Sequence, residues 1–180
     1  MRIIAGSLRG QQFDSPTGHK THPMGEKVRG ALFNILGDIE GLTILDAFAG
    51  SGAISFEALS RGADSAVAIE LDKPAHQVIA DNAQKLGLQD RLRTVHSNSL
   101  SWSKKHIQDW FDVVICDPPY DKIPELHIQK LATHVKRGGI LVLSWPTHLP
   151  VPELKNLEYL KDNTYAEARL IFYKKETPIV

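Results

Sequence analysis

The sequence predicts an α/β fold: a doubly wound, mostly parallel sheet with an antiparallel C-terminal hairpin and a small N-terminal β-hairpin or arm. Short β-rich runs alternate with helical runs from residue 26 onward, as in a parallel sheet covered by helices on both faces. Acidic or amide residues follow the predicted strands at their carboxyl ends, where such sheets bind ligands. We expect residues 1–25 to form the arm and residues 26–180 to form the main domain.

The first half of the main domain is predicted to contain three helices and two strands. Apolar residues at helical spacing predict the first helix, and glycines mark the ends of the first two helices. In order, the elements are a helix at Glu26–Leu36, a strand at 42–48, a helix at 53–61, a strand at 65–70 and a helix at 73–88.

The second half is predicted to continue the alternation and then to close with two neighbouring strands. Its elements are a strand at 91–97, a short helix at 99–106, a strand at 111–116, a helix at 124–135, a strand at 138–145 and a hairpin formed by 157–165 and 167–175. Such a terminal hairpin adds antiparallel strands to one edge of the sheet.

Bulk composition is ordinary for a globular protein and excludes several classes of site. The 180 residues are 42% hydrophobic, and 21 basic side chains balance 21 acidic ones. The single cysteine, Cys116, excludes an intrachain disulfide and a cysteine-cluster metal site, and it reads as a small core residue. The eight histidines show no metal-ligand spacing. We therefore expect no metal site. The sequence also shows no signal peptide and no apolar run long enough to span a membrane, so we expect no membrane association and a cytoplasmic location.

The run "LDAFAGSGA" joins a strand, an acid and a glycine turn that leads into a helix. Small residues let the backbone approach a ligand, and a helix N-terminus offers unpaired N–H donors. A dinucleotide fingerprint needs a third glycine where Ser55 stands, and Asp46 would repel a pyrophosphate. A nucleoside that carries an amino acid fits better, because its ammonium group pairs with a carboxylate.

Two further strand ends complete this predicted pocket. Glu70 can accept hydrogen bonds from both hydroxyls of a ribose, and Asn98 can bond an adenine edge through its amide. The pattern predicts S-adenosylmethionine as the cofactor, with these candidate ligands: Asp46, Phe48, Gly50, Ser51, Gly52, Glu70, Leu71, Asn98 and Ser99. A tight turn at the two glycines and a helix-capping role for Glu70 are the alternative interpretations.

The run "DPPYDK" follows directly on the apolar strand "FDVVIC". Two prolines specify a rigid, non-helical exit from the strand. The exocyclic amino group of a nucleobase is a poor nucleophile, and two fixed acceptors could hold its N–H bonds in attack geometry. We therefore expect the Asp117 carboxylate and the Pro118 carbonyl to accept these bonds, Pro119 to stiffen the loop and Tyr120 to stack on the base. The alternative is a rigid turn in which Asp117 caps a neighbouring helix.

The N-terminal segment is basic on an otherwise neutral chain. Residues 1–30 hold five Lys or Arg against two acids. An arm of this kind could contact phosphates, although on charge alone a solvated N-terminal extension is the favoured interpretation. The candidate RNA-binding residues are Arg2, Arg9, Lys20, His22, Lys27 and Arg29. Trp145, at the end of the fifth strand, either packs or flanks the substrate pocket.

Taken together, "MRIIAGSLRG", "EKVRGALFNIL", "ILDAFAGSGAISFEALSRGA", "DPPY" and "LIFY" resemble the RsmD-type 16S rRNA (guanine-N(2))-methyltransferases over nearly the whole chain. The resemblance implies a Rossmann-like methyltransferase sheet in a bacterial enzyme. It also implies methyl transfer from S-adenosylmethionine to the 2-amino group of one guanine in 16S rRNA. Separately, the neutral net charge favours a small-subunit assembly particle as the substrate, because protein contacts could then add to recognition. Two alternatives stay open: a DNA adenine amino-group methyltransferase, and a catalytically silent RNA-binding assembly factor.

The chain departs from the family pattern at several positions. The family usually has Arg-Pro-Thr where this chain has His22 to Met24, and Asp and Arg where Glu26 and Lys27 stand. A glutamate is usual at Gly30, and an aspartate is usual at Asn98. Histidine is a weaker phosphate partner than arginine, so these departures concern the contacts of the arm more than the reaction.

Overall fold

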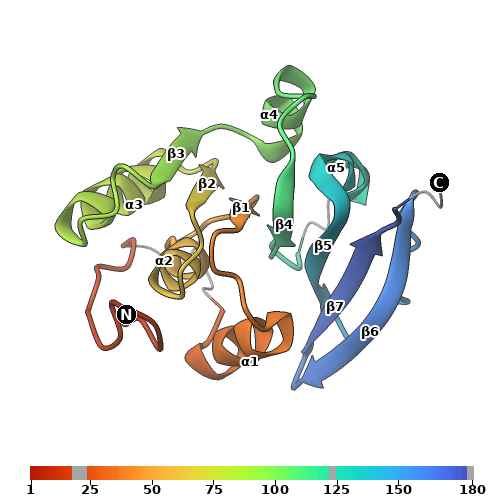
Figure 1. Ribbon diagram of the computed structural model, residues 1–180, viewed down its shortest axis with the longest axis horizontal. Coiled ribbons are helices and arrows are strands. Elements are labelled where there is room, and N and C mark those ends of the chain that lie inside the picture. Colours follow the sequence, from red (N-terminus) through yellow and green to blue (C-terminus); the bar gives the residue numbers. More distant parts are fainter. Residues whose placement is uncertain (18–23, 122–124, 178–180) are drawn as a thin grey trace.

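The computed structural model describes residues 1–17, 24–121 and 125–177, and a seven-stranded sheet runs through its centre (Figure 1). The strand order is β3-β2-β1-β4-β5-β7-β6. The pairs β1–β2, β1–β4, β2–β3 and β4–β5 are parallel, and β7 runs antiparallel to β5 and β6. The strands are β1 (Thr43–Asp46), β2 (Ser65–Glu70), β3 (Leu92–His96), β4 (Phe111–Cys116), β5 (Val135–Pro146), β6 (Leu157–Tyr165) and β7 (Ala168–Lys175). This arrangement confirms the predicted fold class.

Helices cover both faces of the sheet and divide the core into two clusters. Buried residues of α1, α2 and α3 pack against one face, and those of α4 and α5 pack against the other. The helices are α1 (Glu26–Leu36), α2 (Ala53–Ser60), α3 (Lys73–Lys85), α4 (Ser99–Lys105) and α5 (Glu125–Leu131), which a 3₁₀ turn (Ala132–His134) extends. Every residue of α2 is buried, including the polar Ser55, Glu57 and Ser60.

The strand β5 begins earlier than the sequence predicted. The helix expected to reach residue 135 ends at Leu131, and β5 already pairs with β4 at Val135. A bulge in this pairing accommodates Gly138, whose φ is +76°. At Gly139 a Cβ atom would lie 2.7 Å from the Asp112 carbonyl oxygen, so the close approach requires a glycine. The glycine pair therefore lies inside the strand and does not start it.

The sequence predicted a small β-hairpin or arm at the N-terminus, and residues 1–17 form an irregular loop. A single antiparallel bridge joins Arg2 and Gln12, and residues 1–17 contain no regular strand. The loop bends at Gly6, whose φ is +84°. A Cβ atom there would lie 1.9 Å from the Ser60 carbonyl oxygen of α2. The segment therefore follows the surface of α2 (red beside α2 in Figure 1) and its backbone bonds to that helix, which leaves little regular hairpin pairing.

Apolar side chains anchor this loop in the core. Ile3 and Phe13 are 1% and 2% exposed, and the Phe13 ring meets that of Phe56 edge-on at 5.0 Å. The interpretation of the segment as a solvated extension is therefore wrong for residues 1–13.

A buried carboxylate on α2 fixes the same loop. Glu57 is fully buried and accepts hydrogen bonds from the backbone N–H groups of Ile4 (2.8 Å) and Ala5 (3.1 Å). The Nε of Arg61 donates to it at 2.8 Å, and the Nε of Arg29 lies 3.7 Å away. Burial lowers the pKa of Arg29, and the neighbouring Glu57 charge opposes that change. Glu57 therefore ties the loop, α1 and α2 together.

The described residues contain neither a membrane-spanning helix nor a cluster of metal-binding side chains. Within 1–17, 24–121 and 125–177, no helix is long and apolar enough to span a bilayer. The same ranges hold no group of three or more His, Cys, Asp or Glu side chains placed to bind a metal ion.

Candidate active site

Three carboxylates meet at the carboxyl ends of β1, β2 and β4, and the sheet register brings them there. Asp46 pairs with Ala68 of β2 and with Ile115 of β4. Glu70 and Asp117 each lie two residues beyond these partners, so both side chains point to the face that Asp46 occupies. The charges of Asp117 and Glu70 both act on Asp46, consistent with this placement.

Asp46 is the most deeply buried of the three. The hydroxyl of Ser55 donates to its Oδ2 at 2.7 Å, and Oδ1 has no hydrogen-bond partner among the described residues. Burial, helped by the charges of the two neighbouring carboxylates, raises the pKa of Asp46 to about 7 against the lowering effect of the Ser55 hydrogen bond. A positive charge brought to this site would favour the ionised form of Asp46.

The glycine turn between β1 and α2 is held by the second carboxylate. The Gly50 N–H donates to Glu70 Oε2 at 2.7 Å, and the Asp72 N–H donates to Oε1 at 2.7 Å. Gly50 and Gly52 have φ values of +56° and +77°, which favour glycine. Glu70 thus joins the turn to the end of β2. Each of its oxygens keeps further acceptor capacity for a hydroxyl.

Asn98 caps the helix α4 with its side-chain oxygen, so this oxygen is already engaged and is less available to a ligand. Its Oδ1 accepts from the N–H groups of Leu100 (3.0 Å) and Ser101 (3.3 Å). The amide nitrogen is then the group left to bond an adenine edge. Ser99 is buried, and its hydroxyl lies 3.5 Å from His127 Nδ1 on α5.

The remaining predicted cofactor ligands differ in exposure. Ser51 is buried within the turn, Phe48 is half-buried, and Leu71 is 64% exposed beside Glu70. An exposed leucine at the carboxyl end of β2 is available to cover an apolar ligand surface.

The loop that follows β4 carries the third carboxylate. Burial raises the pKa of Asp117 to about 6, against the lowering effect of the neighbouring Ser144 hydroxyl. Pro118 is buried, Pro119 is exposed and the Tyr120 ring is half-buried. The Tyr120 hydroxyl lies 2.7 Å from the Ser144 hydroxyl on β5. Cys116, just before the loop, is fully buried with a raised pKa, so it is a core residue and not a nucleophile.

The chemistry of these groups selects a cationic ligand. Three carboxylates at one sheet edge repel each other, and two of them have raised pKa values because burial disfavours their charge. A ligand with an ammonium and a sulfonium group would offset this repulsion and supply a donor for Asp46 Oδ1. A pyrophosphate would add to the repulsion. The residues therefore fit S-adenosylmethionine and do not fit a dinucleotide.

The predicted RNA-binding residues fall into three groups. Arg9 and Lys27 are exposed, and the exposed Arg2 pairs with Glu26 at 3.0 Å. Lys20 and His22 lie outside the described residues. The prediction for Arg29 is wrong: its side chain is fully buried and donates to the backbone carbonyls of Arg2 (2.8 Å) and Met24 (3.2 Å).

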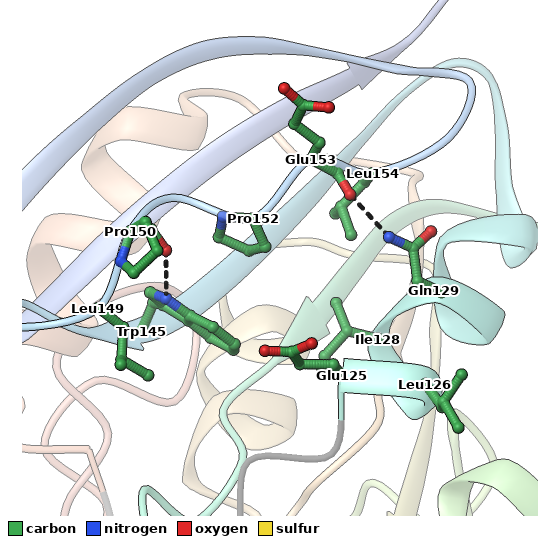
Figure 2. A pocket seen from close by; sticks show the side chains of 10 residues that line it. All are labelled: Glu125, Leu126, Ile128, Gln129, Trp145, Leu149, Pro150, Pro152, Glu153 and Leu154. Carbon is green, nitrogen blue, oxygen red and sulfur yellow. Dashed lines mark hydrogen bonds between the residues drawn. The ribbon is translucent and has the colours of Figure 1, made fainter.

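A separate pocket of about 320 Å³ lies between α5 and the segment after β5. Figure 2 shows Trp145 in its wall, with Nε1 donating to the Pro150 carbonyl at 3.0 Å. None of the three carboxylates or their predicted partners lines this pocket. Trp145 is 2% exposed, which agrees with the packing interpretation.

Two residues of this site escaped the sequence prediction. Ser144 lies two residues before the end of β5 and carries neither an acid nor an amide, so the rule applied to the other strand ends did not select it. Ser55 stood out only as a missing glycine, whereas it donates to Asp46. Hydroxyl side chains inside apolar runs carry little signal until the sheet register is known.

Comparison with known proteins gives concordant results. The model of a family described as Conserved hypothetical protein 95 matches residues 1–174. "Ribosomal RNA small subunit methyltransferase D" of Haemophilus influenzae is 32% identical over 91% of this chain and 88% of its own length. The Escherichia coli protein of the same name is 37% identical over 67% of this chain and 60% of its own length. The solved structure "Putative methyltransferase yhhF from Escherichia coli" superposes with a TM-score of 0.85, at 29% identity and 98% coverage of both chains.

Proposed function

The chain belongs to the Conserved hypothetical protein 95 family, that of the RsmD-type rRNA methyltransferases, and from this premise we propose that it methylates the 2-amino group of a guanine in 16S rRNA. The observation that carries the proposal is the meeting of Asp46, Glu70 and Asp117 at one sheet edge, with the Pro-Pro-Tyr loop attached to the last of them.

The cofactor is S-adenosylmethionine, which supplies an electrophilic methyl group on a sulfonium when bound. Asp46 would pair with its ammonium group, and Glu70 would accept from its ribose hydroxyls. The amide of Asn98 would donate to the adenine edge, since its oxygen caps α4. Phe48, Leu71 and the backbone of the glycine turn would enclose the nucleoside.

The loop after β4 would orient the acceptor. The Asp117 carboxylate and the Pro118 carbonyl would accept the two N–H bonds of the guanine 2-amino group, which turns its lone pair toward the methyl group. Transfer of the methyl group would form an N–C bond as the S–C bond breaks, with the electron pair left on sulfur. The nitrogen would then release one proton to solvent, and the nearby Asp117 carboxylate would stabilise the positive charge until that proton leaves. Tyr120 would stack on the flipped base.

The RNA would approach across the N-terminal loop and the start of α1. Arg2, Arg9 and Lys27 are exposed there and can contact phosphates, whereas the overall charge of the chain is zero. A neutral protein gains little long-range attraction to RNA, which favours a small-subunit assembly particle as the substrate, because protein contacts can then add to recognition.

A labelling experiment tests the proposed acceptor. The protein is incubated with methyl-labelled S-adenosylmethionine and, in parallel, with unmodified small-subunit particles, naked 16S rRNA and duplex DNA. We expect label in the RNA as 2-methylguanosine and none in the DNA, because the related proteins are rRNA methyltransferases.

Two other outcomes contradict this proposal. Label recovered as N6-methyladenine in the duplex would assign the chain to DNA modification. A protein that binds RNA but shows no calorimetric binding of S-adenosylmethionine would be an assembly factor without catalytic activity.

A further inference from the structure

Ser144 lies beside the proposed catalytic loop although it belongs to a different strand. Cys116 of β4 pairs with Leu143 of β5 in parallel register. The next residues of the two strands are Asp117 and Ser144, so these side chains lie next to each other on the same face of the sheet. Ser144 is only 3% exposed, and its hydroxyl needs hydrogen-bond partners inside the protein.

The partners of Ser144 fix the direction of a short hydrogen-bond chain. Its hydroxyl lies 2.7 Å from the Tyr120 hydroxyl, and it lowers the pKa of the neighbouring Asp117 carboxylate. An ionised carboxylate can only accept, so a Ser144 hydroxyl that turns toward Asp117 donates its single proton there. Tyr120 must then donate its proton to Ser144. The chain runs from Tyr120 through Ser144 to Asp117.

We propose that Ser144 is a positioning residue of the methyl transfer, which holds the Asp117 carboxylate and the Tyr120 ring in their working orientation. This inference rests on the proposed function, in which both of these side chains contact the acceptor base. The hydroxyl of Ser144 on β5 thereby sets the position of the Asp117 carboxylate relative to the Tyr120 ring.

The neighbouring Ser144 hydroxyl also favours the ionised form of Asp117, which is the form that can accept. Burial raises the pKa of Asp117 to about 6, and Ser144 opposes that rise. A carboxyl with a raised pKa loses its charge as the pH falls through that value, and a protonated Asp117 accepts the amino group poorly. Without Ser144 the pKa would rise further, and the loss of charge would begin at a higher pH.

The test compares Ser144→Ala with Ser103→Ala. Ser103 is an equally buried serine, 3% exposed, whose hydroxyl lies 2.7 Å from His134 Nε2 on the opposite face of the sheet. Two quantities are measured: the pH dependence of kcat for RNA methylation, and the titration of the Asp117 carboxyl by carbon-13 NMR in the cofactor-free protein. We expect Ser144→Ala to move both midpoints up by about one to two pH units, the effect of losing one hydrogen bond to a charged group. Ser103→Ala should leave both unchanged.

The variant Tyr120→Phe distinguishes the interaction of Tyr120 with Ser144 from that of Ser144 with Asp117. It removes the donor to Ser144 but leaves the bond from Ser144 to Asp117, so both midpoints should move less than in Ser144→Ala. The NMR titration does not depend on catalysis and therefore tests the inference even if no RNA is methylated. An Asp117 midpoint that is the same in Ser144→Ala and the wild type would overturn the role of Ser144. Absence of RNA methylation by the wild type would overturn the proposed function instead.

Discussion

Replacing Asp117 by alanine is expected to reduce methyl transfer to 16S rRNA by about 10²–10³-fold or more, the cost of removing one preorganised group that stabilises developing charge. The variant loses the carboxylate that accepts the guanine amino group and faces the positive charge on the attacked nitrogen. Cofactor binding should remain largely intact, because Asp46 and Glu70 stay in place. Single-turnover transfer of labelled methyl measures the first effect, and calorimetry with S-adenosylhomocysteine measures the second.

Asp117→Asn is the matched control for this substitution. It keeps the shape of the side chain and one acceptor oxygen but removes the charge, so its activity should fall between those of the wild type and Asp117→Ala. Thermal unfolding of both variants checks that the loop remains folded. If Asp117→Ala transferred methyl groups at the wild-type rate, the proposed role of Asp117 in the reaction would be wrong.

Replacing Glu57 by alanine is expected to lower the free energy of unfolding by about 3–5 kcal/mol, as when one member of a buried ion pair is removed. The substitution leaves the fully buried Arg29 without its carboxylate and frees the N–H groups of Ile4 and Ala5. Urea unfolding measures the loss. Hydrogen exchange at Ile4 and Ala5 should accelerate, since these amides would lose their only acceptor among the described residues.

Glu26→Ala provides the comparison at an exposed site. Glu26 also pairs with an arginine of the N-terminal loop, Arg2, but both side chains are in solvent. The expected loss is below about 1 kcal/mol. If Glu57→Ala proved no more destabilising than Glu26→Ala, the loop would be held by its apolar anchors, Ile3 and Phe13, and not by the buried carboxylate.

The part of the site that follows from strand ends could be predicted from the sequence. Apolar runs followed by an acid place Asp46, Glu70 and Asp117 at the ends of strands. Parallel pairing then brings them to one edge, as the register of β1 with β2 and β4 shows. No knowledge of side-chain contacts was needed, because the topology alone decides which ends meet.

The features that the sequence did not reveal depend on contacts between distant segments. The sequence predicted that Arg29 binds phosphate. In the structure Arg29 is buried against Glu57, which lies 28 residues further along the chain. The N-terminal loop reads as solvated until its backbone is seen to bond α2. The role of Asn98 as the cap of α4 uses the oxygen that the sequence interpretation left free for adenine. Residue type indicates the chemistry of a group but not its partner.

Mass mapping of methylated nucleotides in 16S rRNA from cells that lack this chain tests the central claim most directly. We predict that one 2-methylguanosine is missing from the RNA, and that the wild-type chain restores it whereas Asp117→Ala does not. The same 2-methylguanosine content in 16S rRNA with and without the chain would contradict the account.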